Sequence, residues 1–128
     1  MENSEVQIWE CRLAAAGEDG RIACDFAELI WNDQICDVQQ VKLLSSPIAR
    51  VREVTAWAVK DLGRDGIAMR TLLENGPNDT SDRVRLMMVS ALKEASFLTI
   101  LELEKHAAAL AKDPNSRVQA MLAEVRAR

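Results

Sequence analysis

The chain has 128 residues, 48% of them hydrophobic and 28% charged, which predicts one soluble globular domain over residues 1–128. Its formal net charge of −4 disfavours nucleic acid as a partner, because phosphate backbones repel an acidic protein unless its positive charges gather on one face. The sequence contains neither an apolar run near the roughly 20 residues that a membrane span needs nor a signal peptide, so we expect no membrane partner and a cytoplasmic location.

Two helices are predicted in the N-terminal quarter of the chain. The first covers residues 4–16, where apolar residues recur on one face at helical spacing: Val6, Trp9, Leu13 and Ala16. The second covers residues 21–32 and is apolar nearly all round, which indicates deep burial or an interface, such as a homodimer through this N-terminal helix. Trp31 lies off the main apolar stripe of the second helix, and both a core and an interface position are open for it.

From residue 35 onward the sequence repeats itself. After a helix predicted over residues 35–45, three triplets open helical segments at spacings of 33 and 34 residues: Arg50-Val51-Arg52, Arg83-Val84-Arg85 and Arg117-Val118-Gln119. A turn begins five residues before each valine: Ser46-Pro47, Asp79-Thr80 and Asp113-Pro114. Further helices are predicted over 67–74, 81–95, 97–111 and from 116 onward. Self-similarity at this period is typical of a stacked helical solenoid.

The alternation of a short helix, an Asp/Ser-Pro turn and a helix beginning x-Val-Arg resembles HEAT-like repeats, including the bilin-lyase-type subgroup. The resemblance covers mainly residues 35–128, as three clearer repeats. It leaves 1–34 as a degenerate N-terminal helical pair, in which Val6-Gln7 matches Val118-Gln119. The resemblance implies an all-α, right-handed superhelix of about seven helices.

In that family, the turn aspartate and the arginine after the valine commonly bond along the stack. The matching residues here are Arg52, Asp79, Arg85 and Asp113. The pattern departs at Ser46, which replaces the aspartate, and at Gln119, which replaces the arginine. These departures weaken a continuous ladder and suit a short array.

The repeat helices present two stripes. The inner stripe is Val51, Val54, Thr55 and Ala58, and we expect Val84 and Ala91 to be buried between repeats. The opposite stripe gives the candidate protein-binding residues Arg50, Glu53, Trp57, Arg83, Leu86, Ser90 and Arg117. Trp57 stands in a column otherwise held by Ser90 and Glu124, and a tryptophan among charged residues is typical of a binding hot spot. The alternative interpretation folds Trp57 over a neighbouring helix as part of the core.

Residues that could support catalysis or metal binding are few. Cys11, Cys24 and Cys36 are separated by 13 and 12 residues without a close pair, so buried, reduced thiols are expected rather than a zinc site. Glu102 and His106 lie four residues apart, a spacing more often found in a surface pair than in a metal site. We therefore expect no metal, no cofactor and no catalytic residue.

These observations favour a non-catalytic protein–protein interaction module that binds another protein through its concave helix face. An adaptor, an inhibitor or an immunity-type protein would each fit. The alternative is a subunit of an enzyme or of a cofactor-attachment (lyase-type) complex, by fold-level analogy with bilin-lyase-type proteins. DNA binding through Arg50, Arg83 and Arg117 is a third hypothesis, disfavoured by the interleaved acidic residues.

Overall fold

The computed structural model describes residues 3–127, and the side chains of residues 5–127. This part of the chain is all-α, as predicted, and has eight α-helices where about seven were expected. The helices are α1 (Asn3–Ala16), α2 (Gly20–Trp31), α3 (Asp37–Leu44), α4 (Ala49–Leu62), α5 (Ile67–Asn75), α6 (Asp82–Glu94), α7 (Ile100–Ala108) and α8 (Ser116–Arg126). A short 3₁₀-helix, η1 (Gly76–Asn78), follows α5.

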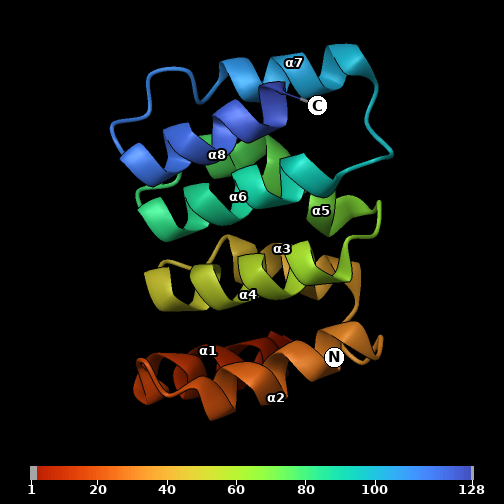
Figure 1. The fold of residues 1–128 in the computed structure, drawn as a ribbon. Coiled ribbons are helices and arrows are strands. Elements are labelled where there is room, and N and C mark those ends of the chain that lie inside the picture. Colours follow the sequence, from red (N-terminus) through yellow and green to blue (C-terminus); the bar gives the residue numbers. More distant parts are fainter. Residues whose placement is uncertain (1–2, 128) are drawn as a thin grey trace.

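The helices form four successive pairs, stacked from the N-terminal to the C-terminal end (Figure 1). The even-numbered helices α2, α4, α6 and α8 form one layer, in which each helix packs against the next. In the other layer, α3 packs against both α1 and α5. The arrangement is consistent with a helical solenoid, and its right-handed sense remains a prediction.

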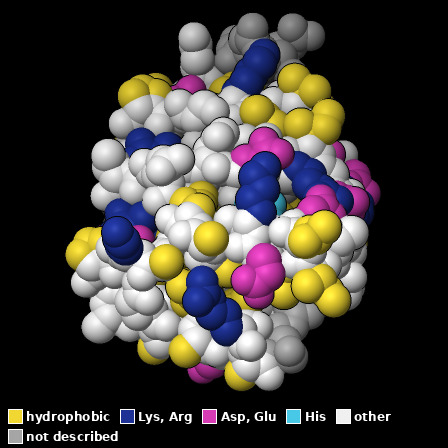
Figure 2. Space-filling view, turned by 90° about the horizontal axis from the view of Figure 1, so that it is seen from above, with side chains coloured by type: hydrophobic (Ala, Val, Ile, Leu, Met, Phe, Trp, Pro, Cys, Tyr) yellow, Lys and Arg dark blue, Asp and Glu magenta, His cyan; other side chains and the backbone are white. Residues whose placement is uncertain are grey.

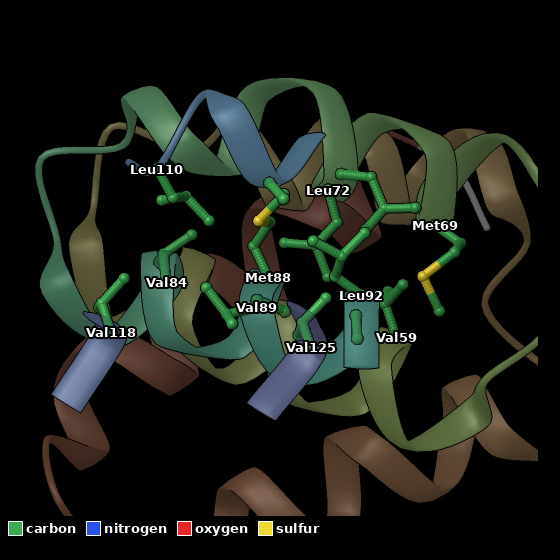
Figure 3. Close-up of a cluster of buried hydrophobic side chains, with 14 of the residues drawn as sticks. Val59, Met69, Leu72, Val84, Met88, Val89, Leu92, Leu110, Val118 and Val125 are labelled. Carbon is green, nitrogen blue, oxygen red and sulfur yellow. The ribbon is translucent and has the colours of Figure 1, made fainter. Parts of the chain in front are cut away.

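Two apolar clusters make the core. The N-terminal core cluster contains Val6, Trp9, Leu13, Phe26, Ile30, Leu43, Val51, Val54 and Ala58, among others. The C-terminal core cluster lies between α4 and α8 (Figure 3) and includes Val59, Met69, Leu72, Val84, Met88, Ala91, Leu92, Leu110, Val118 and Val125. Burial of the inner stripe of α4, and of Val84 and Ala91, confirms the predicted core face. Helix α4 contributes residues to both clusters.

Side-chain caps set several helix ends. Ser81 caps α6 by accepting a hydrogen bond from the backbone N–H of Val84. Thr99 and Glu102 form a capping box, which starts α7 at Ile100 instead of at the predicted residue 97. Gly63 ends α4 with a φ of 66°, a left-handed conformation that glycine adopts without steric cost.

A ladder of arginine–aspartate pairs joins the last three pairs of helices. Arg52 donates from Nε to Asp79 at 2.9 Å, and Arg85 donates from Nε to Asp113 at 2.6 Å. Each arginine also donates to a carbonyl of its own turn, Arg52 to Ser46 O at 2.9 Å and Arg85 to Asp79 O at 3.0 Å. These bonds run along the stack in the way that the family resemblance implies.

The two departures from the repeat pattern have defined contacts. Ser46, which stands in place of the turn aspartate, donates from Oγ to Glu10 on α1 at 2.7 Å. Gln119 keeps the bond to its own turn, because its Nε2 donates to Asp113 O at 2.9 Å. The ladder therefore stops at its two ends for different reasons. At the N-terminal end Ser46 binds Glu10 in place of an arginine. At the C-terminal end Gln119 binds only the carbonyls of its own turn.

The prediction of buried cysteines was wrong, because Cys11, Cys24 and Cys36 are free and exposed. Cys11 and Cys24 lie on the faces of α1 and α2 turned away from the core, and Cys36 immediately precedes α3. In α2 the buried positions are Ala23, Phe26, Ala27 and Ile30, which leaves the thiol of Cys24 outside the apolar face. An apolar sequence context did not predict burial at these three positions.

Candidate protein-binding site

A hollow lies on the layer of even-numbered helices, where α2, α4 and α6 meet. It has a volume of about 320 Å³. Its lining residues are Gly20, Ala23 and Cys24 from α2, Arg50, Glu53, Val54 and Trp57 from α4, and Arg83 and Met87 from α6. We call it the α2–α4–α6 hollow. It brings together four of the seven predicted site residues: Arg50, Glu53, Trp57 and Arg83.

Trp57 has both an intramolecular contact and a face on the hollow. Its ring packs edge-on against Trp31, with ring centroids 5.6 Å apart and an interplanar angle of 73°. Trp31 in turn donates from Nε1 to the carbonyl of Ala58 at 3.1 Å. Both rings are half-buried and pack against the N-terminal core cluster, so each has a structural role inside the chain. Only Trp57 of the two lines the hollow.

The apolar surface of α2 is largely covered within the chain. Its buried residues pack in the N-terminal core cluster, and Ile22, Leu29 and Trp31 pack against the same cluster while half-buried. Intramolecular packing therefore explains much of the apolar character that predicted an interface there. A homodimer through this helix remains a prediction.

The charged rim of the hollow is partly neutralised. Glu53 accepts a hydrogen bond from Ser81 Oγ at 2.7 Å and lies 3.8 Å from Arg83 Nη1. Arg83 also pairs with Glu18 at 3.1 Å. Glu18, followed by Glu53, raises the pKa of the Arg83 guanidinium above its ordinary value. Among the described residues, Arg50 forms no ion pair and donates no side-chain hydrogen bond, so it is the unpaired cation of the rim.

The other three predicted site residues lie elsewhere. Leu86 is half-buried and packs against the C-terminal core cluster, Ser90 is half-buried, and Arg117 is exposed near the start of α8. The apolar residue that α6 contributes to the hollow is therefore Met87 and not the predicted Leu86. Sequence reasoning also missed Gly20, Ala23 and Cys24, because α2 was expected to be interior or interfacial and not a wall of the site.

Glu102 and His106, whose spacing raised the question of a metal site, lie in different surroundings. No group of three or more His, Cys, Asp or Glu side chains in this part of the chain is arranged to hold a metal ion. His106 is buried at 8% exposure, and this burial, followed by the nearby charge of Lys105, lowers the pKa of its imidazole. Glu102 is bound to Arg70 at 2.6 Å and to the backbone N–H of Thr99 at 3.0 Å. The expected surface pair of Glu102 and His106 was thus wrong at His106, which lies inside.

Among the residues that the structure describes, no helix combines the length and apolar character that crossing a membrane requires. Comparison with protein-family models, with curated proteins and with solved structures finds no match to this chain.

Proposed function

We propose that the chain is a non-catalytic protein-interaction module that binds a partner protein at the α2–α4–α6 hollow. The observation that carries this proposal is a half-buried tryptophan in an apolar depression whose rim is charged. Protein interfaces commonly have an apolar centre, a polar rim and a tryptophan anchor. The layer of even-numbered helices would supply the binding face, as concave faces do in solenoids.

The size of the hollow favours side chains of a partner over a complete cofactor. Its volume of about 320 Å³ lies at the low end of the roughly 300–1,000 Å³ found for small-molecule sites. An adaptor, an inhibitor or an immunity-type protein would each use such a site. A role as a subunit of an enzyme or of a cofactor-attachment complex rests on the fold-level analogy alone.

The distribution of arginines argues against nucleic acid as the partner. Arg52 and Arg85 are bound to Asp79 and Asp113, and Arg83 is bound to Glu18. Phosphate recognition needs positive charge segregated on one surface. Figure 2 shows the end of the stack formed by α7 and α8, where Lys and Arg side chains are interspersed with Asp, Glu and hydrophobic side chains.

Two matched cysteine substitutions test the proposal. Cys24→Trp places a bulky ring at the wall of the hollow, while Cys11→Trp adds the same ring at an exposed site on α1 that does not line it. Both thiols are exposed, so neither change should disturb the core. Proteins that co-purify with the tagged chain from lysate of its native cell are quantified by mass spectrometry for both variants and the unaltered chain. We expect at least one specific partner to be lost with Cys24→Trp and retained with Cys11→Trp.

Equal recovery of every specific partner with both variants would show that the hollow is not the docking site. Thermal melts of both proteins are the control, because a large drop in melting temperature for Cys24→Trp alone would mean that the added ring disturbs the packing of α2 and α4. In that case Cys24→Glu, which introduces charge with less bulk, replaces it in the same comparison.

A further inference from the structure

We infer that the α2–α4–α6 hollow accepts an acidic segment of a partner protein, in which a carboxylate side chain lies close to an apolar one. Arg50 binds the carboxylate, and the apolar side chain occupies the hollow beside Trp57 and Met87. This inference rests on the proposed function and adds the chemistry of the partner.

Arg50 differs from the other arginines of α2, α4 and α6. Arg21 pairs with Asp19, Arg52 with Asp79, Arg83 with Glu18, and Arg85 with Asp113. In the part of the chain that the structure describes, Arg50 has no such partner, although it is half-buried at the wall of the hollow. A guanidinium presents five donors in a planar fork that matches a carboxylate. A partner carboxylate would satisfy these donors in a setting that is partly shielded from water.

Glu53, the lining carboxylate nearest to Arg50 in sequence, already has partners within the chain. Glu53 binds Ser81 at 2.7 Å through Oε2, and its Oε1 lies 3.8 Å from Arg83. Glu53 therefore holds the start of α6 against α4. Arg83 is paired with both Glu53 and Glu18. Within the described residues, the charge left unpaired at the hollow is therefore the positive charge of Arg50, although the chain as a whole has a net charge of −4. This local sign selects an acidic partner over a basic one.

The apolar part of the hollow explains why the partner segment also needs an aliphatic or aromatic side chain. Ala23, Val54, Trp57 and Met87 line it. Methionine adapts its shape to different apolar groups, and a tryptophan face contributes a large contact area. A carboxylate alone would leave the apolar lining of the hollow exposed to water. An apolar side chain alone would leave Arg50 unpaired. The two requirements together define a segment with both groups.

A selection with a phage-displayed library of random dodecapeptides tests the inference. The library is panned on the unaltered chain, Arg50→Gln, Arg117→Gln and Cys24→Trp, and the recovered peptides are sequenced. Arg117→Gln is the matched control, because Arg117 is exposed, lies outside the hollow and has no ion pair or side-chain hydrogen bond among the described contacts. Circular dichroism and thermal melts establish that all four proteins are folded.

Peptides that are recovered with the unaltered chain but lost with Cys24→Trp require an open hollow. We expect these peptides to be enriched in Asp or Glu near an apolar residue. Arg50→Gln should remove the acidic enrichment and leave the apolar one, and Arg117→Gln should change neither. For a recovered peptide, replacing the acidic residue by its amide should weaken binding about tenfold or more, which is typical of a charge-assisted hydrogen bond.

Three other outcomes separate the inference from the proposed function. Hollow-dependent peptides without acidic enrichment, or with an enrichment that survives Arg50→Gln, would overturn the inference and leave the docking site in place. The absence of any peptide that depends on the open hollow would contradict the proposed function itself. Enrichment of basic peptides would also overturn the inference, because it would assign the recognition to Glu53.

Discussion

Arg85 on α6 donates from Nε to Asp113 Oδ2 at 2.6 Å, across the boundary between the third and fourth helical pairs. The side chains are 14% and 4% exposed, so the pair is largely removed from water. Asp113 also accepts the backbone N–H of Asn115, the residue that caps α8. One carboxylate therefore both fixes the turn before α8 and ties this turn to the preceding repeat.

Replacing Asp113 by Ala should destabilise the chain strongly. The change leaves the guanidinium of Arg85 without its partner in a mostly buried position, and breaking such a pair costs about 3 kcal/mol or more of unfolding free energy. Urea denaturation followed by circular dichroism measures the loss. The matched control is Arg64→Ala, which breaks the exposed pair of Arg64 with Asp33 and should cost at most about 1 kcal/mol. Equal losses in the two variants would mean that the ladder adds no more than a surface ion pair.

Gly76 packs closely against α6 and leaves no room for a side chain. A Cβ atom on Gly76 would lie 2.6 Å from Met88 Cβ on α6, closer than packed atoms approach. Because Cβ cannot rotate away, Gly76→Ala should push η1 from α6 and cost about 1–3 kcal/mol. Gly20→Ala is the control, since a Cβ there meets nothing within 4 Å. Thermal or urea denaturation distinguishes them, and equal stability of the two variants would contradict this packing.

The repeat motif predicted three of the four helices in the even-numbered layer. The fourth, α2, was predicted as a helix over residues 21–32 but not as a copy of the motif, because its valine position holds Ile22, 29 residues before Val51, and its arginine position holds Ala23. The caps reveal the match, since Asp19 precedes Ile22 by three residues, as Ser81 precedes Val84. The copy expected at Val6-Gln7 lies instead in α1, which belongs to the other layer. A comparison of the sequence with itself at a fixed spacing of 33 or 34 residues does not detect a repeat that is shorter and lacks the ladder arginine.

The candidate site was predicted only in part for a related reason. Column patterns gave the side of each helix that faces away from the core, and this placed Arg50, Glu53 and Arg83 on one surface. They could not give the exact rotation of α6, which turns Met87 and not Leu86 into the hollow. Nor could they show that a side chain as long as Trp57 reaches across to Trp31 on a neighbouring helix. Both depend on packing between distant segments.

The burial of His106 predicts that the stability of the chain depends on pH near neutrality. It is the only histidine in the sequence, and burial, followed by Lys105, lowers the pKa of its imidazole from the ordinary value of 6.5, against the opposing effect of Glu74 and Glu102. The unfolded chain then binds a proton more readily than the folded chain does. Unfolding free energy should therefore fall as the pH drops through about 6.5 towards the lowered pKa of the folded state.

The measurement compares the unaltered chain with His106→Gln in urea at about pH 7.5 and about pH 5, where the linked proton uptake differs. The carboxylates titrate in both proteins, so the extra loss of stability in the unaltered chain on acidification reports the imidazole alone. The pKa is read directly from the single histidine signal by NMR. A pKa at or above the ordinary value, or equal losses in the two proteins, would contradict burial of the neutral imidazole.

Trp57 packs against Trp31 and also lines the hollow. Two substitutions separate its contribution to stability from its proposed contribution to binding. Trp57→Ala removes the edge-on contact with Trp31 and part of the N-terminal core cluster, so it should cost about 2 kcal/mol of unfolding free energy, less than for a fully buried ring. This differs from the near-intact stability expected for an outward-facing tryptophan. Trp57→Phe keeps an aromatic ring against Trp31 and should retain most of that stability. Urea denaturation measures both variants.

The binding role is then measured with the folded Trp57→Phe protein and a peptide recovered from the dodecapeptide selection. The smaller ring fills less of the hollow, so affinity measured by fluorescence anisotropy of the labelled peptide should fall about tenfold, as when a central tryptophan anchor is reduced. Ser90→Ala, on the same stripe but outside the hollow, should leave the affinity unchanged. An unchanged affinity in Trp57→Phe, together with lowered stability in Trp57→Ala, would assign Trp57 to the core alone, and the hollow would lose the anchor on which its binding role rests.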